Sequence, residues 1–192
     1  MIKPFTLCTV FLFFCFNSGL LMAEEMLIID DRQSNGLASN LGSEWRMVSD
    51  GVMGGVSSGS LALDSVDGKK CLHLRGSVRL ENSGGFLQAA LDIERTAASN
   101  ASTYQGLLLE VYGNNEVYNL HLRTDDIQRP WQSYRASFNA PAQWLKVKLP
   151  FDAFTAYRIE KEMDTAHLKR IGIAAIGRAF TADLCIARLA LY

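Results

Sequence analysis

The stretch that decides the fold is Trp45-Arg46-Met47-Val48-Ser49-Asp50-Gly51-Val52-Met53-Gly54-Gly55-Val56-Ser57-Ser58-Gly59-Ser60. It combines large apolar residues, which favour burial, with Ser, Asp and Gly residues, which favour turns. Glycine adopts backbone conformations that a side chain forbids, and Asp or Ser can accept a hydrogen bond from a nearby amide. A flexible linker would lack the large apolar residues. We therefore predict a tightly folded loop over residues 45–60, held to the core by Trp45 and Met53.

The first 23 residues are typical of a secretory signal peptide. Lys3 gives a positive start, residues 7–16 are almost all apolar, and Ala23 precedes two glutamates, which predicts cleavage after Ala23. An uncleaved anchor is one alternative, but the apolar run is barely long enough to cross a bilayer. A lipid-modified Cys15 is another, but two phenylalanines stand before it where a lipoprotein needs small residues. The prediction is a periplasmic or secreted chain with no stable membrane anchor after cleavage.

Cleavage would leave residues 24–192, which we expect to form a single domain with its own core. Only Lys3 is charged in the leader, so the net charge would change from −1 to −2. The basic residues are scattered along the chain. This balance argues against nucleic acid or an anionic membrane surface as the partner.

The mature chain alternates between short apolar segments and turn residues. The predicted strands are 26–31, 60–64, 70–75, 78–80, 86–91, 106–112, 117–122, 134–138, 145–149, 171–176 and 184–191. Residues 117–122 are expected to return from a Gly113-Asn114-Asn115 turn as the hairpin partner of 106–112. Only residues 164–170 look helical, with Asp164 as the N-cap. The pattern predicts an all-β fold, a β-sandwich or jelly roll with at most one short helix.

Two cysteines, Cys71 and Cys185, remain after the predicted cleavage. An exporting compartment permits a disulfide between them. The alternative is two free, buried cysteines, which are common in protein cores. The absence of a Cys-x-x-Cys motif in the sequence argues against a redox motif or a zinc knuckle.

The opening stretch resembles the signature of the complex I intermediate-associated protein 30 family, in the run of Trp45 followed by Asp-Gly-Val-Met-Gly-Gly-Val-Ser over residues 50–57. Three further segments resemble the same family in the same order. They are Gly76-Ser77-Val78 with Glu81-Asn82 and Gly84-Gly85-Phe86; residues 104–107 with 118–124; and Trp144, Pro150-Phe151 and Phe154 with Ile171-Gly172-Ile173. The resemblance implies a galactose-binding-like β-sandwich. It also implies a chaperone-like assembly role rather than catalysis, because the best-known members help to assemble respiratory complex I.

The sequence motifs that could indicate catalysis match their patterns only in part. Gly55-Val56-Ser57-Ser58-Gly59 fits the Gly-x-Ser-x-Gly elbow of hydrolases, but that elbow requires a following helix and residues 60–64 alternate like a strand. The three histidines lack metal-ligand spacing: His73, His121 and His167. Carboxylates near glycines, at 30–31 and 50, leave calcium as an alternative without the usual dense spacing. We therefore predict no catalytic residues, no metal and no cofactor.

Two segments are candidates for binding. The first is the opening stretch, through Trp45, Asp50, Met53, Gly54 and Gly55. The second is the loop from Arg123 to Arg135, through Arg123, Arg129, Trp131 and Tyr134. Aromatic and Arg side chains suit either a protein partner or a sugar, and Trp131 could instead simply pack over the sheet edge. Two functions follow. One is an assembly factor for an exported or membrane protein of unknown identity; the other is a carbohydrate-binding module of the cell envelope.

Overall fold

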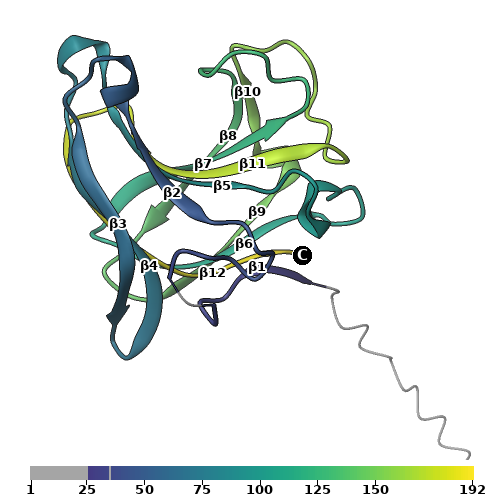
Figure 1. Ribbon diagram of the computed structural model, residues 1–192, viewed down its shortest axis with the longest axis horizontal. Coiled ribbons are helices and arrows are strands. Elements are labelled where there is room, and N and C mark those ends of the chain that lie inside the picture. Colours follow the sequence, from purple (N-terminus) through teal and green to yellow (C-terminus); the bar gives the residue numbers. More distant parts are fainter. Residues whose placement is uncertain (1–25, 35) are drawn as a thin grey trace, which may run out of the picture.

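A computed structural model describes residues 26–34 and 36–192 and confirms the all-β prediction. Two antiparallel sheets pack face to face (Figure 1). The predicted signal peptide, residues 1–23, lies outside the described residues. Among those described, no helix is long and apolar enough to cross a membrane.

The first sheet, here the β12 sheet, has six strands in the order β3-β4-β12-β6-β9, with β1 also paired to β12. Its strands are β1 (Leu27–Asp30), β3 (Ser58–Val66), β4 (Lys69–Val78), β6 (Gly106–Tyr112), β9 (Leu145–Pro150) and β12 (Phe180–Leu191).

The second sheet, here the β11 sheet, has the order β10-β8-β7-β11-β5-β2. Its strands are β2 (Trp45–Ser49), β5 (Phe86–Asp92), β7 (Glu116–Thr124), β8 (Ser133–Ala140), β10 (Thr155–Tyr157) and β11 (Leu168–Ile176). Short 3-10 turns lie between strands: η1 (Asp50–Met53), η2 (Glu81–Ser83), η3 (Ala97–Ser99) and η4 (Phe151–Ala153).

The core lies between the two sheets. Successive side chains of a strand point to opposite faces, so every second residue of each central strand can enter the core. Leu87, Leu120 and Ile173 from the β11 sheet meet Leu107 and Leu189 from the β12 sheet, and all five are fully buried. The residues between them point outward, which gives each sheet a separate outer face.

The predicted 106–112/117–122 hairpin is wrong, because β6 and β7 belong to different sheets. The turn between them crosses from one layer to the other. Gly113 N donates to Pro141 O at 2.8 Å, and Asn114 Nδ2 donates to Thr181 O at 2.7 Å. These bonds connect the turn to the segment after β8 in one sheet and to β12 in the other. Strand alternation identified both strands but carried no information on which partner each would choose.

The predicted helix at 164–170 is also wrong. Asp164 caps a turn: its carboxylate accepts from Ala166 N at 2.9 Å and contacts His167 Nδ1 at 2.7 Å. Leu168 then begins β11, because its side chain is fully buried against the core and β11 pairs with both β5 and β7.

The predicted loop over residues 45–60 is shorter than expected, since its two ends belong to β2 and β3. Trp45 is buried, as predicted, with 2% of its surface exposed. Met53 is 59% exposed, so it does not hold the loop to the core. A polar residue, Asp50, does so instead.

Candidate functional site

Asp50 joins two loops at one end of the sandwich. Its side chain is fully buried. Oδ1 accepts from Ser57 N at 2.9 Å, and Oδ2 accepts from Ser57 Oγ and from Gly85 N, both at 2.5 Å, and from Phe86 N at 3.3 Å. We call the two loops that it connects, residues 50–57 and 79–86, the Asp50 joint.

The joint stabilises the ionised form of its carboxyl group. Burial alone would raise the pKa of Asp50, but the hydrogen bonds from Ser57, Gly85 and Phe86 together lower the pKa below its ordinary value. Glycine is required on both sides of the carboxylate. A Cβ on Gly55 would lie 2.4 Å from Asp50 Cγ, and a Cβ on Gly84 would lie 2.5 Å from Asp50 Oδ2. Asp50 and these glycines therefore support the site from within and are not exposed contacts.

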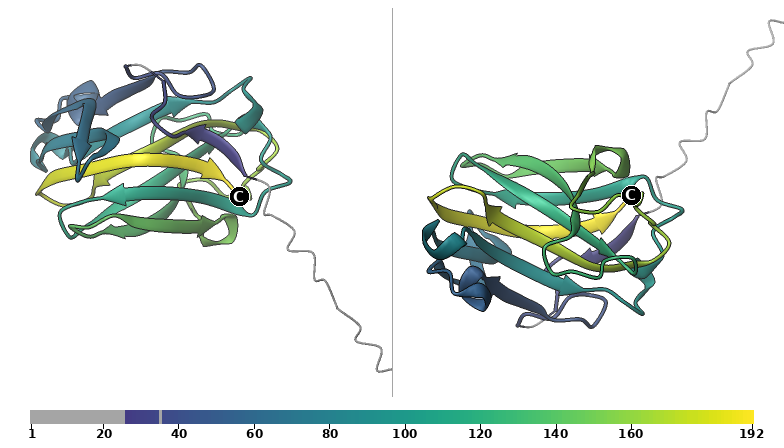
Figure 2. Two further views of the ribbon diagram at one scale, coloured as in Figure 1. Left: turned by 90° about the horizontal axis from the view of Figure 1, so that it is seen from below. Right: turned by 90° about the horizontal axis from the view of Figure 1, so that it is seen from above.

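The joint displays apolar side chains to solvent. Val52 is 74% exposed, Leu80 from the other loop is 50% exposed, and Met53 and Val56 are exposed as well. Gly54 ends the η1 turn with a positive φ of 86°, and Asn82 Nδ2 donates to Gly54 O at 3.1 Å. In both panels of Figure 2 this region lies at the end of the sandwich opposite the C-terminus. A fixed backbone thus presents apolar side chains from two loops.

Trp45 stabilises the fold from a buried position. Its Nε1 donates to Asp30 Oδ2 at 2.5 Å, and the same carboxylate accepts from Arg32 Nε at 2.8 Å. Arg32 also donates to Ala38 O at 2.8 Å. These buried contacts fasten the segment after β1 to the start of β2, so Trp45 is not available to a partner.

The Arg123–Arg135 loop lies at the other end of the β11 sheet. The register shows this, because Ser49 pairs with Leu87 near the start of β5, whereas Thr124 pairs with the first residue of β11, and β5 and β11 are antiparallel. The structure therefore does not bring the two predicted binding segments together. Gln132 closes the loop: its Oε1 accepts from Arg129 N at 3.0 Å, and its Nε2 donates to Arg158 O at 2.9 Å.

The side chains of this loop differ in accessibility. Trp131 is 48% exposed, whereas Tyr134 is buried and its hydroxyl donates to Lys161 O at 2.9 Å. Tyr134 is therefore a support residue. A shallow hollow of about 560 Å³ lies beside Gln132 and Arg158, and Trp131 does not line it.

The outer face of the β11 sheet carries a polar group that the sequence analysis missed. His121 in β7 points outward, between the inward-facing Leu120 and Leu122, yet only 6% of it is exposed. Its Nε2 has no hydrogen-bond partner among the described residues. Burial, together with the positive charge of Arg135 opposite, lowers the pKa of His121 to about 3. The imidazole is therefore neutral at neutral pH, and its unpaired Nε2 atom is buried beneath the outer face.

Gln88 of β5 extends over β11, the strand that lies next to β7. Gly172 pairs with His121 on the neighbouring strand, and a Cβ at Gly172 would lie 1.5 Å from Gln88 Nε2. The missing side chain therefore leaves room for the Gln88 amide on the outer face. The alternation Asn119, His121, Arg123 in β7 was the sequence signal for this polar face.

The sequence profile of the family "Complex I intermediate-associated protein 30 (CIA30)" matches residues 34–186. The chain belongs to this family. No curated protein sequence matches it. The family assignment agrees with the geometry of the joint, because the first two of the four sequence blocks that carried the resemblance contain the two loops that Asp50 connects.

Solved structures similar to this family member are β-sandwiches. The family 11 carbohydrate-binding module of a cellulosomal cellulase of Clostridium thermocellum has a TM-score of 0.69 at 11% identity, covering 88% of this chain and 95% of the module. The family 30 module of another cellulosomal cellulase of that organism has a TM-score of 0.62 at 13% identity, covering 86% and 97%. At these identities the likeness establishes the fold alone.

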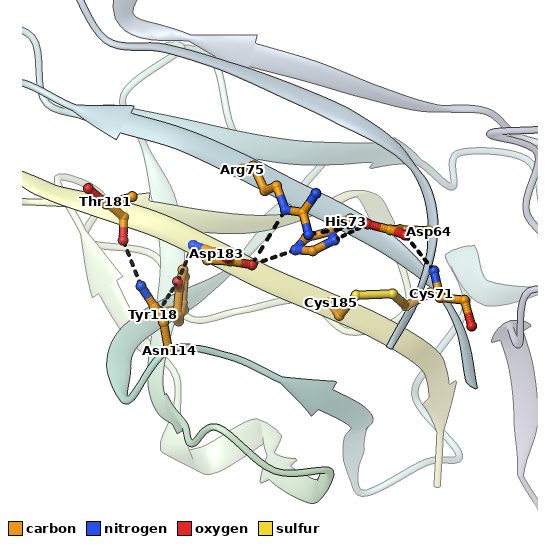
Figure 3. Close-up of polar contacts among 10 residues, drawn as sticks. Asp64, Cys71, His73, Arg75, Asn114, Tyr118, Thr181, Asp183 and Cys185 are labelled. Atoms are coloured by element: carbon orange, nitrogen blue, oxygen red, sulfur yellow. Dashed lines mark hydrogen bonds and ion pairs between the residues drawn. A yellow bond between two sulfur atoms is a disulfide. The ribbon is translucent and has the colours of Figure 1, made fainter. Parts of the chain in front are cut away.

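Cys71 and Cys185 of this family member form a disulfide on the outer face of the β12 sheet, with a Cα–Cα distance of 5.3 Å (Figure 3). Beside it His73 lies between two carboxylates, with Nδ1 2.9 Å from Asp64 Oδ2 and Nε2 2.5 Å from Asp183 Oδ1. The ligand atoms of Cys71, His73 and Cys185 lie within 4.8 Å of one another. The disulfide occupies both sulfur atoms, and both ring nitrogens of His73 contact carboxylates, so none of these three residues offers a free ligand atom in this oxidation state.

Proposed function

We propose that this chain is a non-enzymatic assembly factor that binds a protein partner at the Asp50 joint. The observation that carries this proposal is the set of exposed apolar side chains on two loops that a buried carboxylate holds together. Exposed apolar patches commonly mark interaction sites. A loop that is ordered before binding also loses less conformational entropy when the partner docks.

The class of partner follows from the proposed location. We expect the leader to export the chain, so the partner is an exported or membrane protein with a complementary apolar surface. An assembly factor of this type needs no catalytic group, because it acts by covering apolar surface that the partner later buries elsewhere. The family assignment supports this reading over catalysis.

The test is site-specific photo-crosslinking in the native host. A photoreactive residue replaces Met53 in one variant and Trp131 in the control variant, since both side chains are about half exposed and lie at opposite ends of the β11 sheet. We expect one defined partner to crosslink to position 53 but not to position 131, and Val52→Asp to abolish the product. Equal crosslinking at both positions, or a product that survives Val52→Asp, would contradict the proposal.

A second candidate is carbohydrate binding on the outer face of the β11 sheet. The Gln88 amide favours it, because it lies on this face over Gly172, the residue that pairs with the buried, neutral His121. Neutral hydrogen-bonding groups of this kind suit sugar hydroxyls. The fold likeness to carbohydrate-binding modules is compatible with this candidate.

A glycan array with wild-type, His121→Ala and Trp131→Ala chains tests this candidate. Binding that is lost only with His121→Ala would support the outer face as the site. Loss only with Trp131→Ala would move the site to the Arg123–Arg135 loop. If the folded wild-type chain binds no glycan, the second candidate is excluded.

A further inference from the structure

The outer face of the β11 sheet is rich in arginine. The strand register identifies its outward-pointing residues, since directly paired residues share a face. One row runs Arg46, Ala90, Gly172, His121, Arg135, and the next contains Asp92, Arg170 and Arg123. Among the described strand residues of this face there are thus four arginines and one carboxylate, although the whole chain has a net charge of −1.

The single carboxylate cannot balance the four positive charges. Arg46 and Arg170 share Asp92, at 2.9 Å and 2.5 Å from its two oxygens. Arg123 makes no ion pair with a carboxylate in the described part of the chain; it donates to Arg129 O at 3.1 Å. Burial and the charges of Arg170 and Arg46, offset only in part by Asp92, lower the pKa of Arg123. A positive charge close to His121 is therefore left uncompensated.

The second uncompensated charge is Arg135. Its guanidinium lies 3.5 Å from the centroid of the Tyr157 ring, and its Nε donates to Ser133 Oγ at 2.8 Å. No carboxylate within residues 26–34 and 36–192 forms an ion pair with it. Its register partner on β7 is His121, and Arg123 is two residues beyond His121 on the same strand. Two unpaired arginines thus flank the unpaired Nε2 atom on adjacent strands.

We propose that this face binds an acidic oligosaccharide of the uronate class, with carboxylates at Arg123 and Arg135 and sugar hydroxyls at the Gln88 amide. This inference rests on the second candidate function and specifies its ligand. The planar guanidinium matches the two oxygens of a carboxylate, which makes arginine suited to this recognition. The neutral Gln88 amide on the same face suits the hydroxyls that separate one carboxylate from the next along such a chain.

Single-stranded nucleic acid is the main alternative polyanion, and the face suits it less well. Sequence-tolerant binding of single strands depends on exposed aromatic faces on which bases stack. Tyr157 is an aromatic residue of this face, and the guanidinium of Arg135 already covers its ring.

The experiment compares a uronate hexasaccharide with the same hexasaccharide after chemical reduction of its carboxyl groups, by titration calorimetry on the purified chain. We expect the acidic form to bind at least tenfold more tightly than the reduced form, and the difference to shrink in high salt because exposed charges are screened. Arg123→Gln and Arg135→Gln should each weaken the acidic form about tenfold, or 1.4 kcal/mol, and leave the reduced form unchanged. The matched control is Arg178→Gln, since Arg178 pairs with Glu116 away from these rows.

Three other results of the binding experiment would contradict the proposal in different ways. Equal affinity for both hexasaccharides would overturn the acidic class and leave carbohydrate binding intact. No binding of either form to a folded chain would remove the second candidate function together with this inference. An acidic peptide or a single-stranded oligonucleotide of equal charge that binds as tightly would show a general anion surface and would overturn the sugar class.

Discussion

Asp50→Asn tests whether a buried carboxylate holds the signature loop. Asparagine has almost the same shape, but its Nδ2 is a donor, so it would face the amide hydrogens of Gly85 and Phe86, which now donate to Oδ2. A buried donor left without an acceptor costs about 1–3 kcal/mol, and a hydrogen bond to a charged group contributes about 1.5–3 kcal/mol. With the Ser57 hydroxyl also affected, we expect a loss of roughly 3–5 kcal/mol in the free energy of unfolding.

The assay is denaturant and thermal unfolding of the purified chain at pH 7. For a domain of this size, 1 kcal/mol shifts the melting temperature by about 2–4 °C, so the expected decrease is roughly 6–20 °C. The matched control is Asp67→Asn. Asp67 is exposed in a turn with a φ of 49°, a conformation that asparagine tolerates, so this change should cost less than about 0.5 kcal/mol.

The pH dependence of stability distinguishes the effect of the Asp50 charge from that of its shape, because asparagine keeps the shape without the charge. The pKa of Asp50 is lower in the folded chain than in the unfolded chain, so its contribution is present above about pH 4 and is lost as the pH falls through the folded value. The gap in stability between wild type and Asp50→Asn should therefore narrow below about pH 4. A gap of equal size at pH 7 and pH 3, or a variant as stable as Asp67→Asn, would refute the reasoning.

Three further predictions concern stability. The pKa of His121 is lowered to about 3 in the folded chain, so the unfolded chain gains a proton first as the pH falls. The free energy of unfolding should therefore drop between about pH 6.5 and pH 3 by up to 1.4 kcal/mol per pH unit. Thermal melting of His121→Gln over the same pH range should show a weaker dependence on pH. Replacing Cys71 and Cys185 by alanine opens a crosslink between residues 114 apart, and denaturant titration should show a loss of about 2–5 kcal/mol, with the wild type in reductant falling to the same level. Trp45→Ala should lower the free energy of unfolding by at least about 3–5 kcal/mol, because it also leaves the Asp30 carboxylate with one fewer hydrogen-bond donor. A near-normal midpoint of urea unfolding would contradict this prediction.

The sequence predicted the layers of the fold better than it predicted the site. Alternation along β7 and β11 and the turn residues between strands were sufficient for a two-sheet sandwich, because burial of every second side chain is a local pattern. The partner of a strand is not local, which is why the 106–112 and 117–122 strands were wrongly paired. Met53 was misplaced for a related reason: a large apolar residue favours burial on average, but Asp50 already fills the space beneath the loop.

The missed site has a physical explanation as well. His121 and Arg135 come from consecutive strands and Gln88 from an earlier one, and only the register brings the three to one face. A lone histidine in a strand carries no signal of its own, since its burial and its missing partner depend on Gly172 and Gln88 across the sheet.

The two proposed surfaces share one strand, and this limits how independent they can be. β5 begins at the Asp50 joint, where Phe86 N donates to the carboxylate, and two residues later Gln88 reaches the outer face beside Gly172. Changes that only remove exposed side chains, such as Val52→Asp, leave that backbone bond in place and should affect the joint alone. Changes to Asp50 release the start of β5 and can shift Gln88 as well, and residues in such contact do not behave additively. Exposed side chains of the joint, rather than its buried carboxylate, are therefore the positions at which protein binding can be separated from binding on the outer face.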